Sequence, residues 1–395
     1  MSEQLSLFNE QPDFILLSSS VQEDSITKEV SKVFDYEFSG TVTEEIPMPE
    51  FPKDFEIGLI YGSSGSGKST ILRKAFGEPE EITWDNRYSI ASHFQDAKTA
   101  SSRFGAVGLN SIPTWLKPYK VLSNGEKFRA DLARRLKDGA CIDEFTSVVN
   151  REVAISCSCS IEKFIRKNGL HNIVLCSCHD DIIPYLQPTW IYNTDTHEFY
   201  SGRYLRKPIT IELSRCSVRA WDMFKKYHYL SGEINSASTC YLATYNDIPV
   251  AFVALLTLPG RDVKHAWREH RVVVLPDYQG MGIGNKLSET LGQAYIEKGC
   301  RYFCKTSNPR MGEHRESSPL WRPTKRNRSS REDYIDKDGN VRGNSWEKGY
   351  GMTNELTIKH AHRVCYSHEY IGDGTKYPYT LGADELDTSM QMTMF

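Results

Sequence analysis

Apolar and polar positions change with short periods along the first half of this 395-residue chain. Apolar runs that end in glycine or in charged residues predict buried strands over 57–61, 140–145 and 173–179. Helical spacing between these runs predicts intervening helices, one of them ending near Leu136. The alternation of strands and helices favours an α/β fold.

The pattern restarts after Lys207-Pro208. Strands are expected over 239–244, 250–258, 269–275 and 301–306, and helices over 220–229 and 285–297. The turn Asn246-Asp247 is expected to join the first two strands. A chain of this length with 39% hydrophobic residues suits two α/β domains.

Composition limits the cellular setting. The longest apolar run, Val250 to Leu258, is far short of the ~20 residues that a membrane helix needs. The N-terminus lacks the basic start and apolar core of a signal peptide. Ten cysteines in mostly apolar contexts are expected to be reduced thiols. We therefore expect a cytoplasmic protein without membrane contact.

Charge is distributed unevenly behind the net value of -3. Residues 1–56 carry 13 acidic and 3 basic side chains, whereas residues 301–331 carry 9 Arg or Lys and 2 Glu. A polyanion is expected to meet the second half of the chain.

A glycine-rich loop follows the expected strand 57–61. It reads GSSGSGKST over 62–70 and fits GxxxxGK[ST], with a strand before it and a helix after it. Such a loop turns backbone N–H groups toward phosphates, while its lysine adds a charge and its Ser ligates Mg²⁺. The sequence predicts an ATP and Mg²⁺ site formed by Gly62, Ser63, Gly65, Gly67, Lys68, Ser69 and Thr70.

Two further segments, LSNGE over 122–126 and the pair Asp143-Glu144, resemble the signature motif and Walker B of ABC-type ATPases. The resemblance implies that Asp143 holds Mg²⁺ and that Glu144 positions the attacking water. It also implies a γ-phosphate sensor at His179 and a Q-loop glutamine at Gln95. Ser123 and Gly125 would touch the nucleotide of a second copy, which implies a homodimer through this domain.

This sequence departs from the family at Asn124, where glycine is usual, and at Asn150, where the D-loop carries Asp. The short interval between Lys68 and Ser123 leaves little room for the helical subdomain of transporters. The resemblance is therefore to the soluble ABC ATPases of DNA repair and chromosome maintenance.

The run QGMGIG over 279–284 follows a β-branched strand and resembles motif A of the GNAT acyltransferases. The resemblance implies that Gln279, Gly280, Gly282 and Gly284 bind the pyrophosphate of acetyl-CoA or another acyl-CoA. It also implies that Glu269 or His270, at the start of the expected strand, is the catalytic base. The alternative for Glu269 is a surface residue without a catalytic role. Asn308 is a candidate to orient the substrate or pantetheine, and Tyr366 to reprotonate the thiolate, unless it is only a core residue.

Several residues are candidates for contact with nucleic acid. His228 and Tyr229 faintly resemble the Mom-type DNA-modifying members of the GNAT family. Basic residues with an aromatic among them suit phosphate contact and base stacking, although a solvated loop is the alternative. This second group comprises Arg310, Arg315, Trp321, Arg322, Lys325, Arg326 and Arg328.

The pentapeptide QLSLF over 4–8 resembles the peptide by which bacterial proteins dock on the replication sliding clamp. The resemblance implies contacts from Gln4, Leu5, Leu7 and Phe8. QMTMF over 391–395 is a weaker second candidate, through Gln391, Met394 and Phe395. A strand or helix folded onto the ATPase is the alternative for the N-terminal tail.

These observations predict four segments: an acidic tail over 1–35, an ABC-type ATPase domain over 36–206, a GNAT domain over 209–385 and a terminal peptide over 386–395. The expected function is that of an ATP-hydrolysing, acyl-CoA-dependent N-acyltransferase that modifies a nucleobase amine of DNA near the clamp. One alternative is a protein-lysine or small-amine acetyltransferase regulated by its ATPase domain. Another is a non-catalytic, DNA-associated ABC ATPase.

Overall fold

A computed structural model describes residues 13–202, 208–228, 233–258, 264–330, 364–379 and 390–394. The chain forms two compact units. Met1–Leu109 and Thr114–Arg206 make up the first, and Asn110–Pro113 and Lys207–Phe395 the second. The peptide 4–8, Tyr229 and Phe395 lie outside the described residues.

The first unit is built on a sheet with the strand order β4-β5-β3-β6-β7. β4 (Cys141–Ile142), β5 (Ile173–Ser177), β3 (Ile57–Tyr61) and β6 (Trp190–Asn193) are parallel, and β7 (Glu198–Ser201) is antiparallel to β6. β3 and β5 are mostly apolar, because side chains on both faces of the sheet are buried in apolar clusters. Since parallel strands end at one edge, the segments after β3, β4 and β5 meet there.

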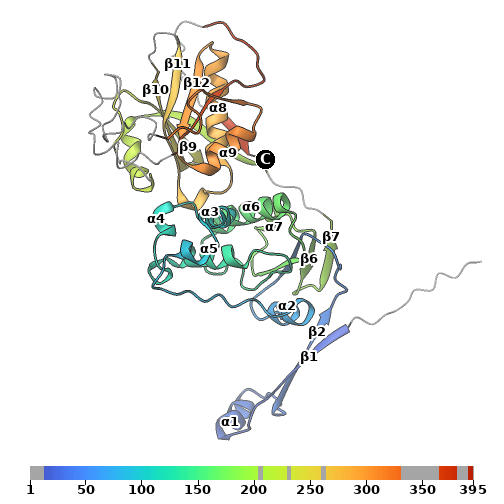
Figure 1. Cartoon of the computed structure of the whole chain (residues 1–395). Coiled ribbons are helices and arrows are strands. Elements are labelled where there is room, and N and C mark those ends of the chain that lie inside the picture. Colours follow the sequence, from blue (N-terminus) through green and yellow to red (C-terminus); the bar gives the residue numbers. More distant parts are fainter. Residues whose placement is uncertain are drawn as a thin grey trace, which may run out of the picture. The chain divides into compact units, whose positions relative to one another are not determined.

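Helices surround this sheet in Figure 1. The α-helices of the first unit and its connections are α2 (Lys68–Phe76), α3 (Ala97–Ala106), α4 (Ile112–Trp115), α5 (Asn124–Arg135), α6 (Arg151–Asn168) and α7 (Ile183–Leu186). Short 3₁₀ turns occupy Ile90–His93 and Tyr119–Val121. The strand expected over 140–145 is only two residues long, because the backbone turns sharply at Glu144 and Thr146, where φ is 52° and 71°.

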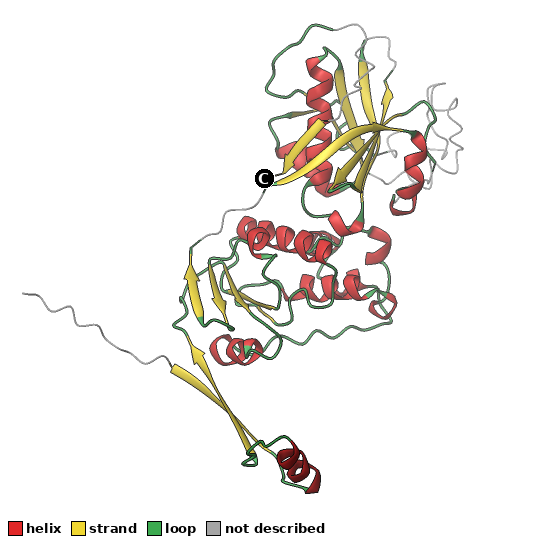
Figure 2. Ribbon diagram, turned by 180° about the vertical axis from the view of Figure 1, so that it is seen from behind, coloured by secondary structure: helices red, strands yellow, loops and turns green. Residues whose placement is uncertain are grey.

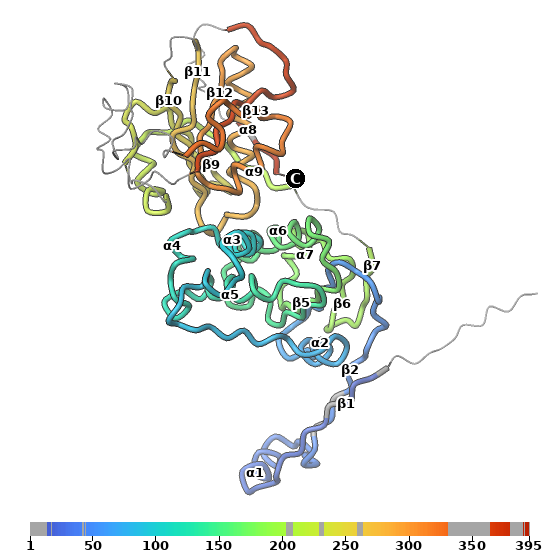
Figure 3. Tube along the Cα trace, viewed as in Figure 1, coloured from blue at the N-terminus to red at the C-terminus, as the bar shows by residue number. Residues whose placement is uncertain are grey.

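An arm precedes this core. β1 (Asp13–Ser20) pairs with β2 (Thr41–Met48) in an antiparallel ribbon, and α1 (Ser25–Val33) lies in the connection between them. Figure 3 shows α1 at the end of the ribbon. Residues 13–33, expected to be part of an acidic tail, thus form a strand and a helix.

The second unit is built on an eight-stranded sheet with the order β13-β14-β12-β11-β10-β9-β8-β15. Its strands are β8 (Ile209–Cys216), β9 (Thr239–Tyr245), β10 (Ile248–Thr257), β11 (Ala266–Val274), β12 (Arg301–Thr306), β13 (Trp321–Pro323), β14 (Tyr366–Tyr370) and β15 (Met390–Met394). All neighbours are antiparallel except β11 and β12. Figure 2 shows this sheet with α8 (Ile283–Glu297) and α9 (Pro309–Ser317) beside it. The turn at Asn246-Asp247 is as predicted, with φ of 49° and 63°.

The prediction of an α-helix over 220–229 is wrong. Two 3₁₀ turns, Val218–Met223 and Lys225–Tyr227, stand in its place. In 3₁₀ geometry residues three apart lie one above the other, so Trp221 and Phe224 both pack against Phe252 of β10. The packing of these two rings on Phe252 therefore accompanies 3₁₀ turns rather than the predicted amphipathic α-helix.

Residues 391–394, predicted to belong to a second docking peptide, form part of a strand in the fold. β15 pairs with β8 from Met390 opposite Leu213 to Met394 opposite Ile209. Met392 and Met394 are 2% and 4% exposed, while Thr393 between them is exposed. The alternation of the peptide is therefore that of an edge strand whose methionines complete the core of the second unit.

Candidate functional sites

The phosphate-binding loop of the first unit runs from the end of β3 to the start of α2. Gly65 and Gly67 adopt φ of 85° and 84°, a left-handed conformation that favours glycine. Lys68, 9% exposed, donates from Nζ to the carbonyl oxygens of Gly62 (2.9 Å) and Ser63 (2.5 Å). Among the described residues no side chain caps the start of α2, so its N–H groups suit a phosphate.

Two predicted Mg²⁺ ligands meet at this loop. Ser69 Oγ donates to Asp143 Oδ1 at 3.0 Å, and Arg73 Nη2 lies 3.6 Å from Asp143 Oδ2. The backbone N–H of Glu144 donates to Asp143 Oδ1 at 2.9 Å. A hydroxyl beside a carboxylate at a phosphate loop fits Mg²⁺, which prefers oxygen ligands and shares them with phosphates.

Glu144 directly follows Asp143, and His179 follows the neighbouring strand β5. The side chain of Glu144 is exposed, and its left-handed backbone turns it away from the line of β4. His179 Nδ1 lies 3.3 Å from the hydroxyl of buried Thr146, and the backbone N–H of His179 donates to Ser177 Oγ at 3.1 Å. Burial, followed by the charge of Arg151, lowers the pKa of His179, so its imidazole is neutral at pH 7.

The remaining residues predicted for the ATPase lie on other segments. Gln95 is exposed and precedes Asp96, which caps α3. Ser123 caps α5 through a capping box with Glu126. Gly125 follows in the first turn, where an added Cβ would meet only Val149 Cγ1, at 3.8 Å.

Sequence reasoning missed Asp195, which follows β6. Its carboxylate accepts hydrogen bonds from the N–H (2.8 Å) and the Oγ (2.7 Å) of Ser63. These bonds lower the pKa of Asp195 and hold the start of the phosphate loop. Asp195 lies 132 residues beyond Ser63, and no local pattern in the sequence links the two.

The second unit has an opening between its two parallel strands. β11 and β12 pair only from Ala266 opposite Arg301 to Arg268 opposite Phe303. Beyond these pairs β11 continues to Val274 and β12 to Thr306, but the two strands no longer pair with one another. The unpaired ends offer backbone groups to an extended ligand.

The glycine-rich loop lies at the end of β11. Gly280 and Gly282 both adopt φ of 93°, and α8 begins directly after Gly282. Gln279 Nε2 donates to the carbonyl oxygen of Val274 at 2.8 Å and ties the loop to the strand. Within the described residues no side chain caps α8, which leaves its first N–H groups suited to a pyrophosphate.

His270 occupies a β-bulge. Ala254 of β10 faces Arg271, and the next residue, Leu255, faces Glu269, so His270 is the extra residue of β11. Burial, with the charges of Arg271, Arg268 and His228, lowers the pKa of His270 to about 4. The structure thus brings His228 and His270, predicted separately, into one electrostatic environment.

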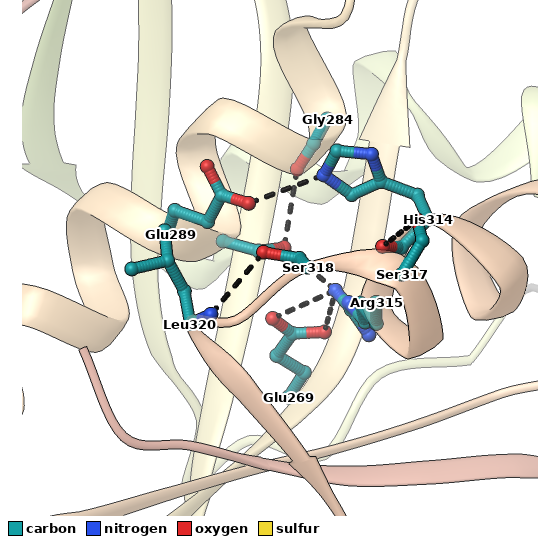
Figure 4. Close-up of polar contacts among 9 residues, drawn as sticks. Glu269, Gly284, Glu289, His314, Arg315, Ser317, Ser318 and Leu320 are labelled. Carbon is teal, nitrogen blue, oxygen red and sulfur yellow. Dashed lines mark hydrogen bonds and ion pairs between the residues drawn. The ribbon is translucent and has the colours of Figure 1, made fainter. Parts of the chain in front are cut away.

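Glu269 is not at the start of its strand and is not at the surface. It is 9% exposed in the middle of β11, and its carboxylate is 2.9 Å from Arg315 Nη2 (Figure 4). Arg315 Nη2 also donates to Ser288 Oγ of α8 at 2.9 Å, and Tyr302 of β12 donates to Glu269 at 3.2 Å. This buried network joins β11, β12, α8 and α9 near the opening.

Two nucleic-acid candidates are corrected by the same network. Arg315 is fully buried, with its guanidinium 4.5 Å from the ring centroid of Trp321. Trp321 is 4% exposed and packs against Tyr370. Neither side chain is at the surface for stacking on a base or for contact with phosphate.

Other basic candidates remain at the surface. Arg322 pairs with Glu369 at 2.7 Å, and Arg328 pairs with Glu316 at 2.5 Å. Lys325 and Arg326 are exposed, and Arg310 lies in the first turn of α9.

The two remaining catalytic candidates have structural partners. Asn308 Oδ1 accepts from the N–H groups of Arg310 (3.1 Å) and Met311 (3.4 Å), so it caps α9. Tyr366 packs on Gly312, where an added Cβ would come within 2.1 Å of the ring. Burial, and then Glu313, raises the pKa of Tyr366.

Comparisons with known proteins agree with the two-unit α/β architecture predicted from the sequence. The model of the acetyltransferase (GNAT) family matches residues 203–315. No curated protein sequence matches the chain significantly. No helix among the described residues is long and apolar enough to cross a membrane.

Solved structures similar to this chain fall into two kinds. The ribosomal-protein-S18-alanine N-acetyltransferase from Escherichia coli is 14% identical, with 44% of this chain and 97% of that chain covered and a TM-score of 0.28. A Bacillus subtilis acetyltransferase in complex with CoA is 14% identical, with 41% and 97% covered and a TM-score of 0.29.

A dimeric ATP-binding cassette in a post-hydrolysis state, bound to ADP and Pi, is 15% identical, with 38% of this chain and 87% of that chain covered and a TM-score of 0.30. The chain therefore contains a GNAT acetyltransferase domain at 203–315, and its structural neighbours include ABC ATPase cassettes.

Proposed function

We propose that this protein is an ATP-hydrolysing N-acyltransferase that uses acetyl-CoA or another acyl-CoA. The observation that carries the proposal is the opening of β11 from β12 beside the uncapped start of α8. The start of α8 suits the pyrophosphate of acyl-CoA, and the opening between β11 and β12 suits its extended thioester arm. His270 lies in the bulge on the same strand.

The chain's own residues fit direct transfer. Acyl-CoA supplies the thioester carbonyl; the amine nitrogen forms the new C–N bond as the C–S bond breaks. His270, whose Nε2 accepts from the N–H of exposed Asn235 at 3.4 Å and whose Nδ1 lies 3.3 Å from Arg271 Nη1, would accept a proton from an amine that displaces the long Asn235 contact. Tyr366, whose pKa is raised by burial, would donate a proton to the departing sulfur. Glu269 has no such role here because its carboxylate is engaged by Arg315 and Tyr302.

In the first unit, Lys68 and the uncapped start of α2 are suited to hold the phosphates of ATP. Ser69 and Asp143 would hold Mg²⁺, whose charge stabilises the leaving phosphate. Glu144 positions the water, and neutral His179 donates a hydrogen bond toward the γ-phosphate.

We propose DNA as the acceptor, through a nucleobase amine. The support is a set of exposed cations on the second unit, Lys325 and Arg326, together with Lys225 and Lys226 just before His228. Lys226 lies 4.8 Å over the ring of Tyr227, which is 40% exposed, so a cation and an aromatic ring are available together. A protein lysine is the competing acceptor.

The N-terminal peptide 4–8 extends this proposal to a partner. QLSLF lies ahead of β1 at the start of an acidic segment, and its resemblance to clamp-docking peptides would bring the enzyme to newly made DNA. A pull-down with purified bacterial clamp tests it. Leu7→Ala/Phe8→Ala should abolish binding, and equal binding by this variant would refute the docking role.

Calorimetry with acetyl-CoA tests the cofactor. Gly282→Glu places a negative charge and a side chain at a left-handed position and should abolish binding. Glu297→Gln, at an exposed position at the opposite end of α8, is the control and should bind acetyl-CoA as the wild type does. Unchanged affinity in Gly282→Glu would remove the acyl-CoA assignment.

Mass spectrometry of nucleosides tests the acceptor. DNA from cells that express the wild type should contain an acylated nucleoside that is absent from cells with Gly282→Glu. If the wild type leaves DNA unmodified while purified protein consumes acetyl-CoA with lysine peptides, the acceptor is protein.

A further inference from the structure

Only the base of the N-terminal arm, at Ile15, Ile46 and Met48, packs on the core of the first unit; the rest of the arm has no covering surface among the described residues. Its ribbon pairs eight residues, from Asp13 opposite Met48 to Ser20 opposite Thr41, and carries no further strand on either edge. α1, at the end of the ribbon in Figure 1, has no buried residue. Short two-stranded ribbons and nine-residue helices are only marginally stable alone in water.

The arm nevertheless exposes many large apolar side chains. Each of them is between 45% and 74% exposed. They are Phe14, Leu16, Val21, Ile26, Val30, Val33, Phe34 and Tyr36. On α1, Ile26, Val30 and Val33 follow spacings of four and three residues, which places them on one stripe.

The charges of the arm restrict what covers this stripe. Residues 1–56 carry 13 acidic and 3 basic side chains, which repel nucleic acid and anionic membranes. Lys28 and Lys32 lie on the face of α1 opposite the stripe, and Lys28 is paired with Glu23 at 3.6 Å. Within α1 only Glu29 borders the stripe, so the stripe itself is uncharged and suits a second uncharged stripe.

The exposed area has the size that one partner of a stable dimer contributes. Over the whole arm, eight apolar side chains of ~150 Å² each, about 60% exposed, present on the order of 700 Å², of which the three side chains of the stripe are one part. A standard protein interface buries about 800 Å² on each partner. A second arm would therefore cover the first with a matching surface.

We propose that the arm docks on the arm of a second copy of this chain, stripe against stripe, in a twofold interface that needs no nucleotide. Open ribbon edges add backbone pairing as a further contact. This inference does not depend on the chemistry of either unit.

The base of the arm links the interface to the phosphate loop. Ile46 of β2 is 3% exposed, and its Cδ1 would lie 2.5 Å from a Cβ added to Gly67. The ribbon is thus anchored directly behind the loop. A dimer held by its arms keeps the two ATPase units at high effective concentration.

Sedimentation velocity of the full chain without nucleotide tests the proposal. The wild type should be dimeric. Val30→Asp/Val33→Asp should weaken dimerisation by at least about a hundredfold, because each buried valine contributes roughly a factor of ten. Lys32→Glu, on the opposite face, should leave the dimer intact.

Each outcome is decisive. A monomeric wild type, or a double variant that dimerises as well as the wild type, would overturn the proposal. Because Val30 and Val33 are 51% and 68% exposed within one chain, both variants should keep the far-UV circular dichroism spectrum of the wild type, which excludes global unfolding as the cause.

Discussion

Buried charge decides the roles of individual residues in the second unit. Glu269 and Arg315 are 9% and 0% exposed and neutralise one another. Nε and Nη1 of Arg315 have no hydrogen-bond partner among the described residues. A charge pair in such a place is costly to break, because the remaining partner is left unpaired in an apolar core.

We predict strong coupling between these two residues. Glu269→Gln and Arg315→Met should each lower the free energy of unfolding by about 3–5 kcal/mol, whereas the double variant should lose less than the sum. Urea denaturation of the four proteins measures this coupling. Strict additivity would show that the pair is not a unit.

The activity of Glu269→Gln separates positioning from catalysis. We expect transfer within about tenfold of the wild type and an unchanged pH profile, because His270 rather than Glu269 accepts the proton. A loss of about a thousandfold, with loss of the basic ionisation, would restore Glu269 as the base.

The lowered pKa of His270 predicts a pH-dependent stability. The folded protein binds its proton only near pH 4, whereas the unfolded chain binds it near pH 6.5. Between these values the unfolded state holds more protons, so stability falls as the pH falls from 6.5 to 4. His270→Gln should lose less melting temperature over this window than the wild type, and equal losses would contradict the shifted pKa.

At the scale of elements, both proposed sites contain the same structural feature. A strand ends in a glycine-rich turn with φ near 90°, and an uncapped helix begins at once, with α2 in the first unit and α8 in the second. This feature exposes N–H groups at a helix start to phosphate in each case. The two units differ in the groups beside the turn, which are carboxylates after β4 in the first unit and an opening between strands in the second.

β15 is the element whose role is least evident from the sequence. Met392→Ala removes a side chain that is 2% exposed and should destabilise the second unit by about 2–3 kcal/mol. Thr393→Ala, at the exposed position between the two methionines, should have little effect. Differential scanning calorimetry compares them, and a neutral Met392→Ala would mean that β15 contributes little to the core.

At the scale of the whole molecule, Gly125 tests the predicted nucleotide site shared by two copies. Among the described residues nothing requires glycine there, since an added Cβ would meet only Val149, at an ordinary distance. Glycine in a helix costs about 1 kcal/mol relative to alanine. If a nucleotide bound to a second copy approaches this helix, the added methyl group would obstruct it.

Gly125→Ala should therefore raise stability by about 0.5–1 kcal/mol and lower ATP hydrolysis at least tenfold. The stability is measured by urea unfolding and hydrolysis by phosphate release. Ser102→Ala, at an exposed position on α3, serves as a control for hydrolysis. Wild-type hydrolysis in Gly125→Ala would argue against a shared nucleotide site.

The sequence by itself determined the two α/β units and the phosphate loop, because strand and helix periodicity and a nine-residue motif are local properties. It also indicated the GNAT domain from QGMGIG, since the turn and helix start that bind pyrophosphate lie within six consecutive residues. Ser69 and Asp143 were found because each belongs to a motif of its own.

Only the tertiary structure decided which polar residues are buried. Glu269 and Arg315 are 46 residues apart, and neither carries a local mark of its partner. The bulge at His270, the bond from Ser63 to Asp195 and the pairing of β15 with β8 are likewise set by distant segments. A short amphipathic peptide such as QMTMF is compatible with a docking segment and with an edge strand. The available edge of β8 and the apolar core beneath that edge decided that residues 390–394 form a strand.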